Sequence, residues 1–298
     1  MAHTEVRACA PDLSERVFAR LGLARAPDPD LAGLDAVYGA YCQRVPFDNI
    51  QRRLAAAVRR SGPLPGASEE EFWARWLEEG TGGTCWAGAG ALGGLLAACG
   101  FTVRRAVATM HPGPHLKEPN HGALVVDLEG ESFLVDPSTT NGVALPLGGG
   151  ERPGVLGGAA VRRGDAGETL LFWRPLHMPA QIPCRIDEIG VGEAVFAARH
   201  EATRVWSLFN YSLNLRVARG DAIVGIAMGR RLALGADGSV TGDRLDPESR
   251  LRFLVEVAGI SESVARAVPE DDSTPPPPGV PAERWAEMLA SLTRAPAA

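Results

Sequence analysis

The chain reads GGTCW at residues 82–86, NHG at residues 120–122 and LVDP at residues 134–137. A cysteine after a glycine-rich turn, a histidine that opens one strand-like run and an aspartate that closes the next are the parts of an activated thiol nucleophile. In such a set the histidine takes the thiol proton and the carboxylate orients the histidine. The pattern predicts an enzyme in which Cys85 is the nucleophile, His121 the base and Asp136 the orienting carboxylate.

The residues after Cys85 predict that the nucleophile lies near the start of a buried helix. Apolar residues recur at i, i+3, i+4 and i+7 between positions 92 and 99, and Gly100 ends the pattern. The partial positive charge at a helix start stabilises a thiolate. Seven glycines interrupt the uncharged run at residues 81–103, which suits close packing inside a protein better than a membrane span.

The spacing around the dipeptide Glu129-Gly130 predicts a tight hairpin. A two-residue loop there pairs residues whose numbers sum to 259, so Asp136 lies opposite Ala123 and diagonal to His121 on one face. A shift of one residue would turn the two side chains to opposite faces. The hairpin therefore predicts that the histidine and the aspartate are neighbours.

The first hundred residues predict helices, and the middle of the chain predicts strands. Helical periodicity covers residues 12–21 and 31–41, with the second helix ending before Pro46. Ser68 and Glu71 form a capping-box signature at the start of a further helix. Strand-like runs follow at residues 102–109, 122–128, 132–135, 170–173 and 222–228, and an apolar stripe at 285–292 predicts a last helix after the prolines at 275–278.

Composition excludes several classes of function. The chain has 298 residues, 45% of them hydrophobic, which is enough for two or three lobes of a globular protein. A net charge of −6 argues against a nucleic-acid partner. The first ten residues carry Glu5 and Arg7 and lack the apolar core of a secretory signal, so we expect a cytoplasmic protein without a membrane partner.

The cysteines and histidines give no metal-site pattern. Five cysteines, an odd number without a C-x-x-C pair, predict reduced thiols rather than a disulfide framework or a zinc ribbon. His111 and His115 flank a flexible Pro-Gly-Pro turn, and with His121 they make only a weak metal-ligand pattern. We expect no metal. Taken alone, Cys85 would more often be a buried structural thiol, and only its combination with His121 and Asp136 favours catalysis.

These motifs resemble those of the arylamine N-acetyltransferase family, whose nucleophile motif is R-G-G-x-C and whose triad follows the order Cys, His, Asp. The chain has TGGTC at residues 81–85, and VPFDNI at residues 45–50 is close to the family's V-P-F-E-N-L. The resemblance implies an α+β fold around a triad core like that of cysteine proteases. Its parts would be an N-terminal helical bundle (1–100) carrying the nucleophile, a central β-barrel (101–208) carrying the histidine and aspartate, and a C-terminal α/β lid (209–298).

The resemblance also implies a reaction. Cys85 would take an acyl group from a thioester, usually acetyl-coenzyme A, and pass it to the nitrogen of an arylamine or hydrazine. The partners are then a small-molecule amine and an acyl thioester, carried by coenzyme A or by a carrier protein, and no cofactor or metal is bound. Phe47, Thr84 and Trp86 are expected near the substrate.

Departures from the family motif leave alternatives open. Thr81 replaces the motif arginine, so Asp48 would lack a cationic neighbour, and Trp86 and Ala87 stand where the family usually has Phe and Glu. The larger indole should reshape the acceptor pocket. One alternative is an amide synthase of secondary metabolism that acts on a thioester held by an acyl carrier protein. Others are a thiol hydrolase, in which water attacks the acyl-enzyme, and a non-catalytic relative that only binds a ligand or partner.

Overall fold

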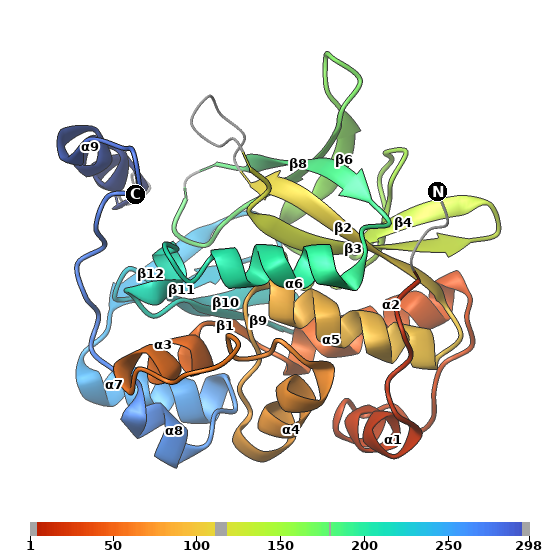
Figure 1. The fold of residues 1–298 in the computed structure, drawn as a ribbon, viewed down its shortest axis with the longest axis horizontal. Helices are drawn as coiled ribbons and strands as arrows, with labels where there is room; N and C mark the ends of the chain where they lie inside the picture. The colour runs from red at the N-terminus through yellow and green to blue at the C-terminus, as the bar shows by residue number, and fades with distance from the viewer. Residues whose placement is uncertain (1–4, 111–117, 179, 294–298) are drawn as a thin grey trace.

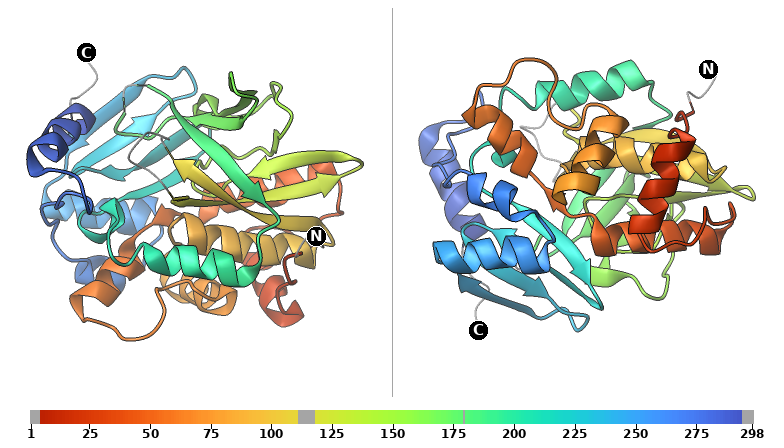
Figure 2. Two further views of the ribbon diagram at one scale, coloured as in Figure 1. Left: turned by 45° about the horizontal axis from the view of Figure 1, so that its top comes forward. Right: turned by 90° about the horizontal axis from the view of Figure 1, so that it is seen from below.

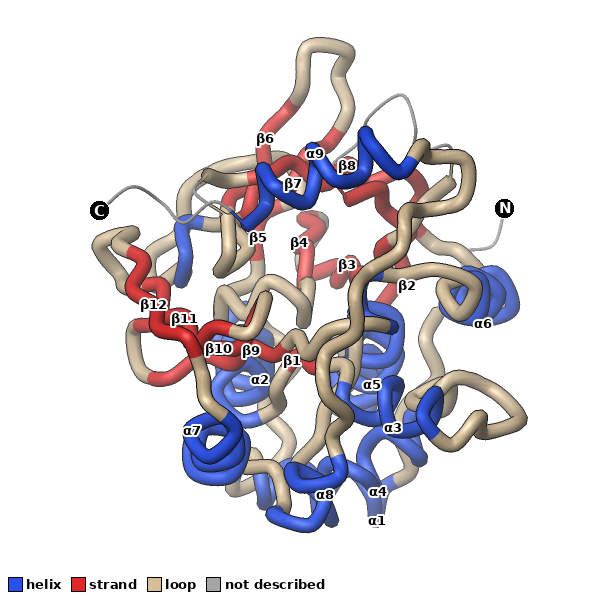
Figure 3. The backbone as a smooth tube through the Cα atoms, turned by 90° about the vertical axis from the view of Figure 1, so that its left-hand side faces the viewer, coloured by secondary structure: helices blue, strands red, loops and turns tan. Residues whose placement is uncertain are grey.

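The computed structural model describes residues 5–110, 118–178 and 180–293, which form an α+β fold of helices and two antiparallel sheets (Figure 1). Figure 3 shows most helices gathered on one side of the strands, with α6 and α9 placed apart from them. The helices are α1 (Pro11–Arg20), α2 (Leu31–Arg44), α3 (Ile50–Ala57), α4 (Glu69–Glu79), α5 (Cys85–Ala98), α6 (Glu193–Ala202), α7 (Pro247–Arg252), α8 (Glu262–Ala267) and α9 (Ala282–Thr293). Short helical turns are η1 (Leu156–Gly158), η2 (Leu208–Asn210) and the π-helix η3 (Phe253–Val257).

The larger sheet is a nearly closed, barrel-like layer. Its strand order is β5-β4-β3-β2-β8-β7-β6, every pair is antiparallel, and the edge strands β5 and β6 contact each other. The strands are β2 (Thr102–Met110), β3 (His121–Leu128), β4 (Glu131–Val135), β5 (Leu145–Pro146), β6 (Ala160–Arg163), β7 (Thr169–Trp173) and β8 (Ile182–Ile189).

The smaller sheet joins a short segment near residue 47 to strands from the last third of the chain. Its order is β1-β9-β10-β11-β12, and the short strand β1, which precedes the nucleophile in sequence, pairs with β9 from the last third of the chain. The strands are β1 (Phe47–Asp48), β9 (Leu215–Arg219), β10 (Ala222–Ala227), β11 (Arg230–Leu234) and β12 (Val240–Arg244).

Helix α5 lies directly against β3, and the alternation of side chains along that strand explains why. Leu124 and Val126 face the helices and belong to the core around α5, whereas Ala123 and Val125 face the interior of the barrel. Glycines let the helix approach closely, since a Cβ at Gly93 would lie 3.2 Å from the Leu124 side chain. Figure 2 shows this helix between the larger sheet and the other N-terminal helices. The packing fixes the first residue of α5 relative to the first residue of β3.

The predicted hairpin register is confirmed. Leu128 pairs with Glu131 and Leu124 with Val135, which are the pairs whose numbers sum to 259. Glu129 and Gly130 both have positive φ, 49° and 87°, as a two-residue turn that follows the twist of the strands requires.

The ends of α4 are set by local hydrogen bonds. Ser68 Oγ accepts a hydrogen bond from the Glu71 backbone N–H at 3.2 Å, as the capping signature predicts. The other half of the capping box is not formed, because the Glu71 carboxylate instead accepts from the Gly66 N–H and from Arg60. The helix ends at Gly80 in the left-handed conformation, with φ of 78°.

The other local predictions are confirmed, but they cover only part of the fold. Helix α2 ends before Pro46, and all five predicted strand runs are strands. No strand was expected at β1, β5, β6, β8, β9, β11 or β12, and no helix at α3, α6, α7 or α8. Within the described ranges, no helix is long and apolar enough to span a bilayer.

Two glycines near the nucleophile test the packing argument. A Cβ at Gly82 would lie 1.8 Å from the Pro46 carbonyl oxygen, whereas a Cβ at Gly90 on α5 would meet nothing within 4 Å. We expect Gly82→Ala to lower the free energy of unfolding by about 1–3 kcal/mol or more, because backbone must move. Gly90→Ala, the matched control, should raise it by roughly 0.5–1 kcal/mol. Chemical denaturation measures both, and equal effects would contradict the assigned packing.

Candidate active site

Cys85 is the first residue of α5, and a backbone junction holds the turn that precedes it. Thr84 has extended dihedrals at the helix N-cap, and Cys85 is only 6% exposed. The Asp48 N–H donates to the Gly83 carbonyl at 3.1 Å, and Phe47 forms a parallel bridge with Gly83. Strand β1 thus fixes the approach of the chain to the cysteine.

His121 and Asp136 come from the two strands of the confirmed hairpin. His121 is the first residue of β3, and Asp136 directly follows β4. His121 Nε2 lies 2.7 Å from Asp136 Oδ2, and the charge of Cys85 raises the pKa of the same ring, which agrees with a sulfur close to it. Because Nε2 is used by the carboxylate, Nδ1 is the nitrogen available to the sulfur. The structure therefore brings together the three side chains predicted as a triad.

The electrostatics of this cluster favour a protonated imidazole. Burial alone lowers the pKa of His121, but the charges of Asp136 and Cys85, and the hydrogen bond to Asp136, raise it to about 10. Burial raises the pKa of Asp136, yet His121 and the hydrogen bond from the Ser138 backbone N–H outweigh it and hold that pKa below its ordinary value. The histidine and aspartate are 3% and 2% exposed, so water screens their interaction little.

Buried hydroxyl and amide groups hold Asp136 in place through its carboxylate and its backbone carbonyl. The Ser138 N–H donates to Asp136 Oδ1 at 2.9 Å. Tyr38 Oη of α2 lies 2.6 Å from both the Asp136 carbonyl oxygen and Asn141 Oδ1, and Thr139 Oγ1 donates to the same carbonyl oxygen. The sequence does not reveal this network, because Tyr38 is one of several residues that share the same apolar periodicity on the helix face.

Sequence comparison shows a similarity to arylamine N-acetyltransferases. A model described as N-acetyltransferase matches residues 30–148. The arylamine N-acetyltransferase of Mycolicibacterium smegmatis is 26% identical over 247 residues, which cover 78% of this chain and 86% of that relative. The chain is similar in sequence and in fold to the arylamine N-acetyltransferases, which are enzymes.

Solved structures of arylamine N-acetyltransferases share the fold. The structure from Mycobacterium smegmatis has a TM-score of 0.72 at 21% identity, covering 87% of this chain and 98% of that one. The Salmonella typhimurium structure has a TM-score of 0.71 at 19% identity, with coverages of 87% and 98%. The Mycobacterium marinum protein, solved in complex with CoA, has a TM-score of 0.70 at 19% identity, with coverages of 84% and 96%.

The arginine-to-threonine departure from the arylamine N-acetyltransferase motif leaves Asp48 without an ion pair among the described residues. The Asp48 carboxylate is 1% exposed and accepts from the backbone N–H groups of Gly82 and Ile50, at 2.7 and 2.8 Å. Burial raises its pKa to about 7, although both hydrogen bonds lower it. Thr81 is buried and accepts from Gln51 instead. The carboxylate therefore holds the nucleophile turn through backbone donors alone.

The three residues expected near the substrate have different surroundings. Phe47 packs edge-on against Phe209 with ring centroids 5.4 Å apart, while Thr84 borders the pocket described next. Trp86 is buried and packs against Phe196, and a Cβ at Gly122 would lie 2.6 Å from its ring. The indole therefore packs against the backbone of Gly122, next to His121. It does not line the pocket beside the nucleophile turn, so its contact with a substrate stays a prediction.

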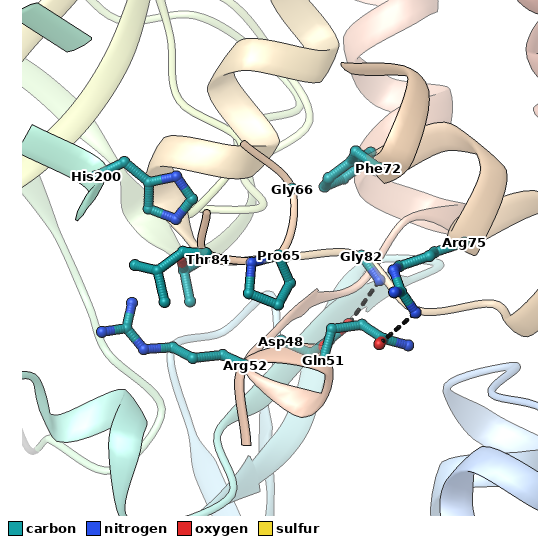
Figure 4. Close-up of a pocket in the computed structure, with 12 residues that line it drawn as sticks. Asp48, Gln51, Arg52, Pro65, Gly66, Phe72, Arg75, Gly82, Thr84 and His200 are labelled. Carbon is teal, nitrogen blue, oxygen red and sulfur yellow. Dashed lines mark hydrogen bonds between the residues drawn. The ribbon is translucent and has the colours of Figure 1, made fainter. Parts of the chain in front are cut away.

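A pocket opens beside the turn that precedes Cys85 (Figure 4). It is lined by residues of α3, α4 and α6 together with the turn, and Figure 4 shows the Asp48–Gly82 and Gln51–Arg75 hydrogen bonds on its floor. His200 of α6 borders it, and burial lowers the pKa of that imidazole to about 4, so it is neutral. The sequence patterns do not predict this pocket, because they do not predict α3 or α6.

The remaining thiols are buried, and no metal site is evident in the described ranges. Burial raises the thiol pKa of Cys9 and Cys42 to about 12 and that of Cys99 to about 11, and it also raises that of Cys184. No group of three His, Cys, Asp or Glu residues among the described ones could hold a metal. The positions 111 and 115, which carry two of the histidines considered above, lie outside the described residues.

The pKa of His121 provides a test of this cluster. We expect NMR titration to show the ring protonated from pH 6 to 9, because its pKa is about 10. The resulting stabilisation is full below the ordinary value of about 6.5 and is lost as pH rises through 10. Cys85→Ala should lower this pKa, and Asp136→Asn should lower it further, because the Asp136 charge is the larger favourable cause.

The control for this titration is Cys99→Ala, at the other end of α5. It lies roughly 20 Å from Cys85 by helix rise and should leave the His121 pKa unchanged. A His121 pKa near 6.5 in the unsubstituted protein would contradict the interpretation.

Proposed function

We propose that this chain transfers an acyl group from a coenzyme A thioester, acetyl-coenzyme A in the first instance, to the amino nitrogen of an arylamine or hydrazine. The observation that carries the proposal is the buried hydrogen-bonded pair His121–Asp136, whose imidazole is under the influence of the charge of Cys85 at the start of α5. Similarity to arylamine N-acetyltransferases supports the reaction class, and the Mycobacterium marinum relative solved with CoA supports coenzyme A as the acyl carrier.

In the first half-reaction the Cys85 thiolate attacks the thioester carbonyl. A bond forms between the Cys85 sulfur and the acyl carbon, and the bond between that carbon and the coenzyme A sulfur breaks. The leaving thiolate takes the proton from the His121 imidazolium. Backbone N–H groups at the start of α5 are suited to stabilise the oxyanion of the tetrahedral intermediate.

Acylation prepares the histidine for its second role. It removes the thiolate charge, one of the causes that raise the His121 pKa, so the neutral imidazole becomes more favourable. The amine then attacks the acyl carbon and gives its proton to His121, and the carbon–sulfur bond breaks. The thiolate and imidazolium are restored, and Asp136 holds the ring in place throughout.

Intact-mass spectrometry tests the nucleophile. We expect the protein to gain one acetyl group when mixed with acetyl-coenzyme A in the absence of amine, and to lose it when an arylamine is added. Cys85→Ala should gain nothing, while Cys99→Ala should behave like the unsubstituted protein. Acetylation that persists in Cys85→Ala would rule out the proposal. Failure of every tested thioester, whether of coenzyme A or of an acyl carrier protein, to acylate the unsubstituted protein would also rule it out.

Steady-state kinetics test the base and separate transfer from hydrolysis. We expect His121→Gln to lower kcat/KM by roughly 10²–10⁴-fold, because proton transfer contributes about that much. Amide product should form in proportion to the amine supplied. Free acetate as the main product at saturating amine would instead identify a thiol hydrolase.

A further inference from the structure

Arg216 of β9 is a buried cation whose hydrogen-bond donors are unused. The residue is 6% exposed, and its Nε atom is fully buried without a hydrogen-bond partner. Within the described ranges its guanidinium forms no hydrogen bond and no ion pair. An unpaired buried charge is unfavourable, and arginine is rarely left without an acceptor in such surroundings.

Register places this cation beside the nucleophile turn. Phe47 of β1 pairs with Arg216 on one side and bridges to Gly83 on the other, so the three residues form one row across adjacent chain segments. Neighbouring segments in such a row are about 4.8 Å apart. Gly83 lies two residues before Cys85, and directly paired residues point to the same face of a sheet. The charge of Cys85 acts on Arg216, which agrees with this proximity.

Two aromatic rings lie close to the guanidinium. Its central carbon lies 4.1 Å from the centroid of the Trp173 ring and 5.2 Å from that of Phe47. Stacking of this kind stabilises the cation and fixes its plane, but it leaves the N–H donors at the edge free. A planar fork of donors beside aromatic rings matches a carboxylate, which accepts two parallel hydrogen bonds.

The guanidinium of Arg216 stays charged, and the imidazole of the nearby His177 is neutral. Burial lowers the pKa of Arg216 to about 10, while the charge of Asp136 raises it, so the guanidinium is protonated at neutral pH. Burial, followed by the charge of Arg216, lowers the pKa of the nearby His177 to about 4, which keeps that imidazole neutral. His177 therefore adds no second positive charge beside Arg216.

We propose that Arg216 is a specificity-determining residue that binds a carboxylate carried by one of the two substrates of this enzyme. The carboxylate belongs either to an aromatic amine acceptor or to the acyl chain of the donor. This inference rests on the proposed function, because the two substrates are those of the proposed acyl transfer. Arg216 could instead balance the net negative charge of the Cys85–His121–Asp136 cluster. Its loss would then affect all substrates alike, whereas loss of a carboxylate-binding residue affects only substrates that carry a carboxylate.

Paired substrates test the proposal in the unsubstituted protein. We expect kcat/KM for para-aminobenzoate to exceed that for its neutral methyl ester, or kcat/KM for succinyl-coenzyme A to exceed that for butyryl-coenzyme A, by roughly 10- to 100-fold. The substrate pair that shows the preference tells whether the carboxylate belongs to the amine acceptor or to the acyl donor. Equal values in both arms would overturn the proposal.

Variants assign the preference to this residue. Arg216→Gln should abolish it while acetylation by acetyl-coenzyme A continues, and Arg216→Lys should retain only part of it because a point charge lacks the planar fork. Arg219→Gln is the matched control, since Arg219 is on the same strand and already donates to the Val257 carbonyl. An unchanged preference in Arg216→Gln, or an equal loss for neutral and anionic substrates, would also overturn the proposal.

Calorimetry keeps the test independent of turnover. Binding of para-aminobenzoate should be tighter than that of its methyl ester, or binding of succinyl-coenzyme A tighter than that of butyryl-coenzyme A, and Arg216→Gln should remove the difference. If Cys85 is acetylated but no carboxylate preference exists, the inference fails and the proposed function stands. If Cys85 is never acylated but the binding preference depends on Arg216, the proposed function fails and the anion site stands.

Discussion

The buried hydrogen bond between His121 and Asp136 is the interaction on which the candidate site depends. Both groups are almost completely removed from water, so either charge alone would be strongly unfavourable, and each is stabilised chiefly by the other. The hairpin turn fixes the register that brings them together, and Tyr38 ties the Asp136 backbone to α2. The rest of the site is built around this pair.

Features determined by neighbouring residues could be predicted from the sequence. The start of α5 at Cys85 followed from a glycine-rich turn and an apolar period, and the pairing of β3 with β4 followed from a two-residue turn. In a strand the side-chain period is two, so one correct turn sets the face of every residue in the hairpin. This is why the closeness of His121 to Asp136 was predictable without knowing the barrel.

Features that depend on distant segments could not be predicted. The pairing of β1 with β9 joins residues about 170 positions apart, and a two-residue strand has no periodic pattern. Arg216 lies in a run of alternating residues in which nothing marks it as buried, and its stacking on Trp173 requires both sheets to be in place. The neighbours of Trp86 were likewise unknown, because Phe196 belongs to a helix that the sequence did not reveal.

The row of paired segments that runs from β9 through β1 to Gly83 has a consequence for biosynthesis. Strand β1 and the nucleophile turn leave the ribosome early, but their supporting strand begins at Leu215, more than two thirds of the way along the chain. During translation the segment before Cys85 therefore lacks its lateral support until the polypeptide is nearly finished. A thiol that depends on this support for its alignment reaches its working geometry late, when most of the protein that shields it has already been made.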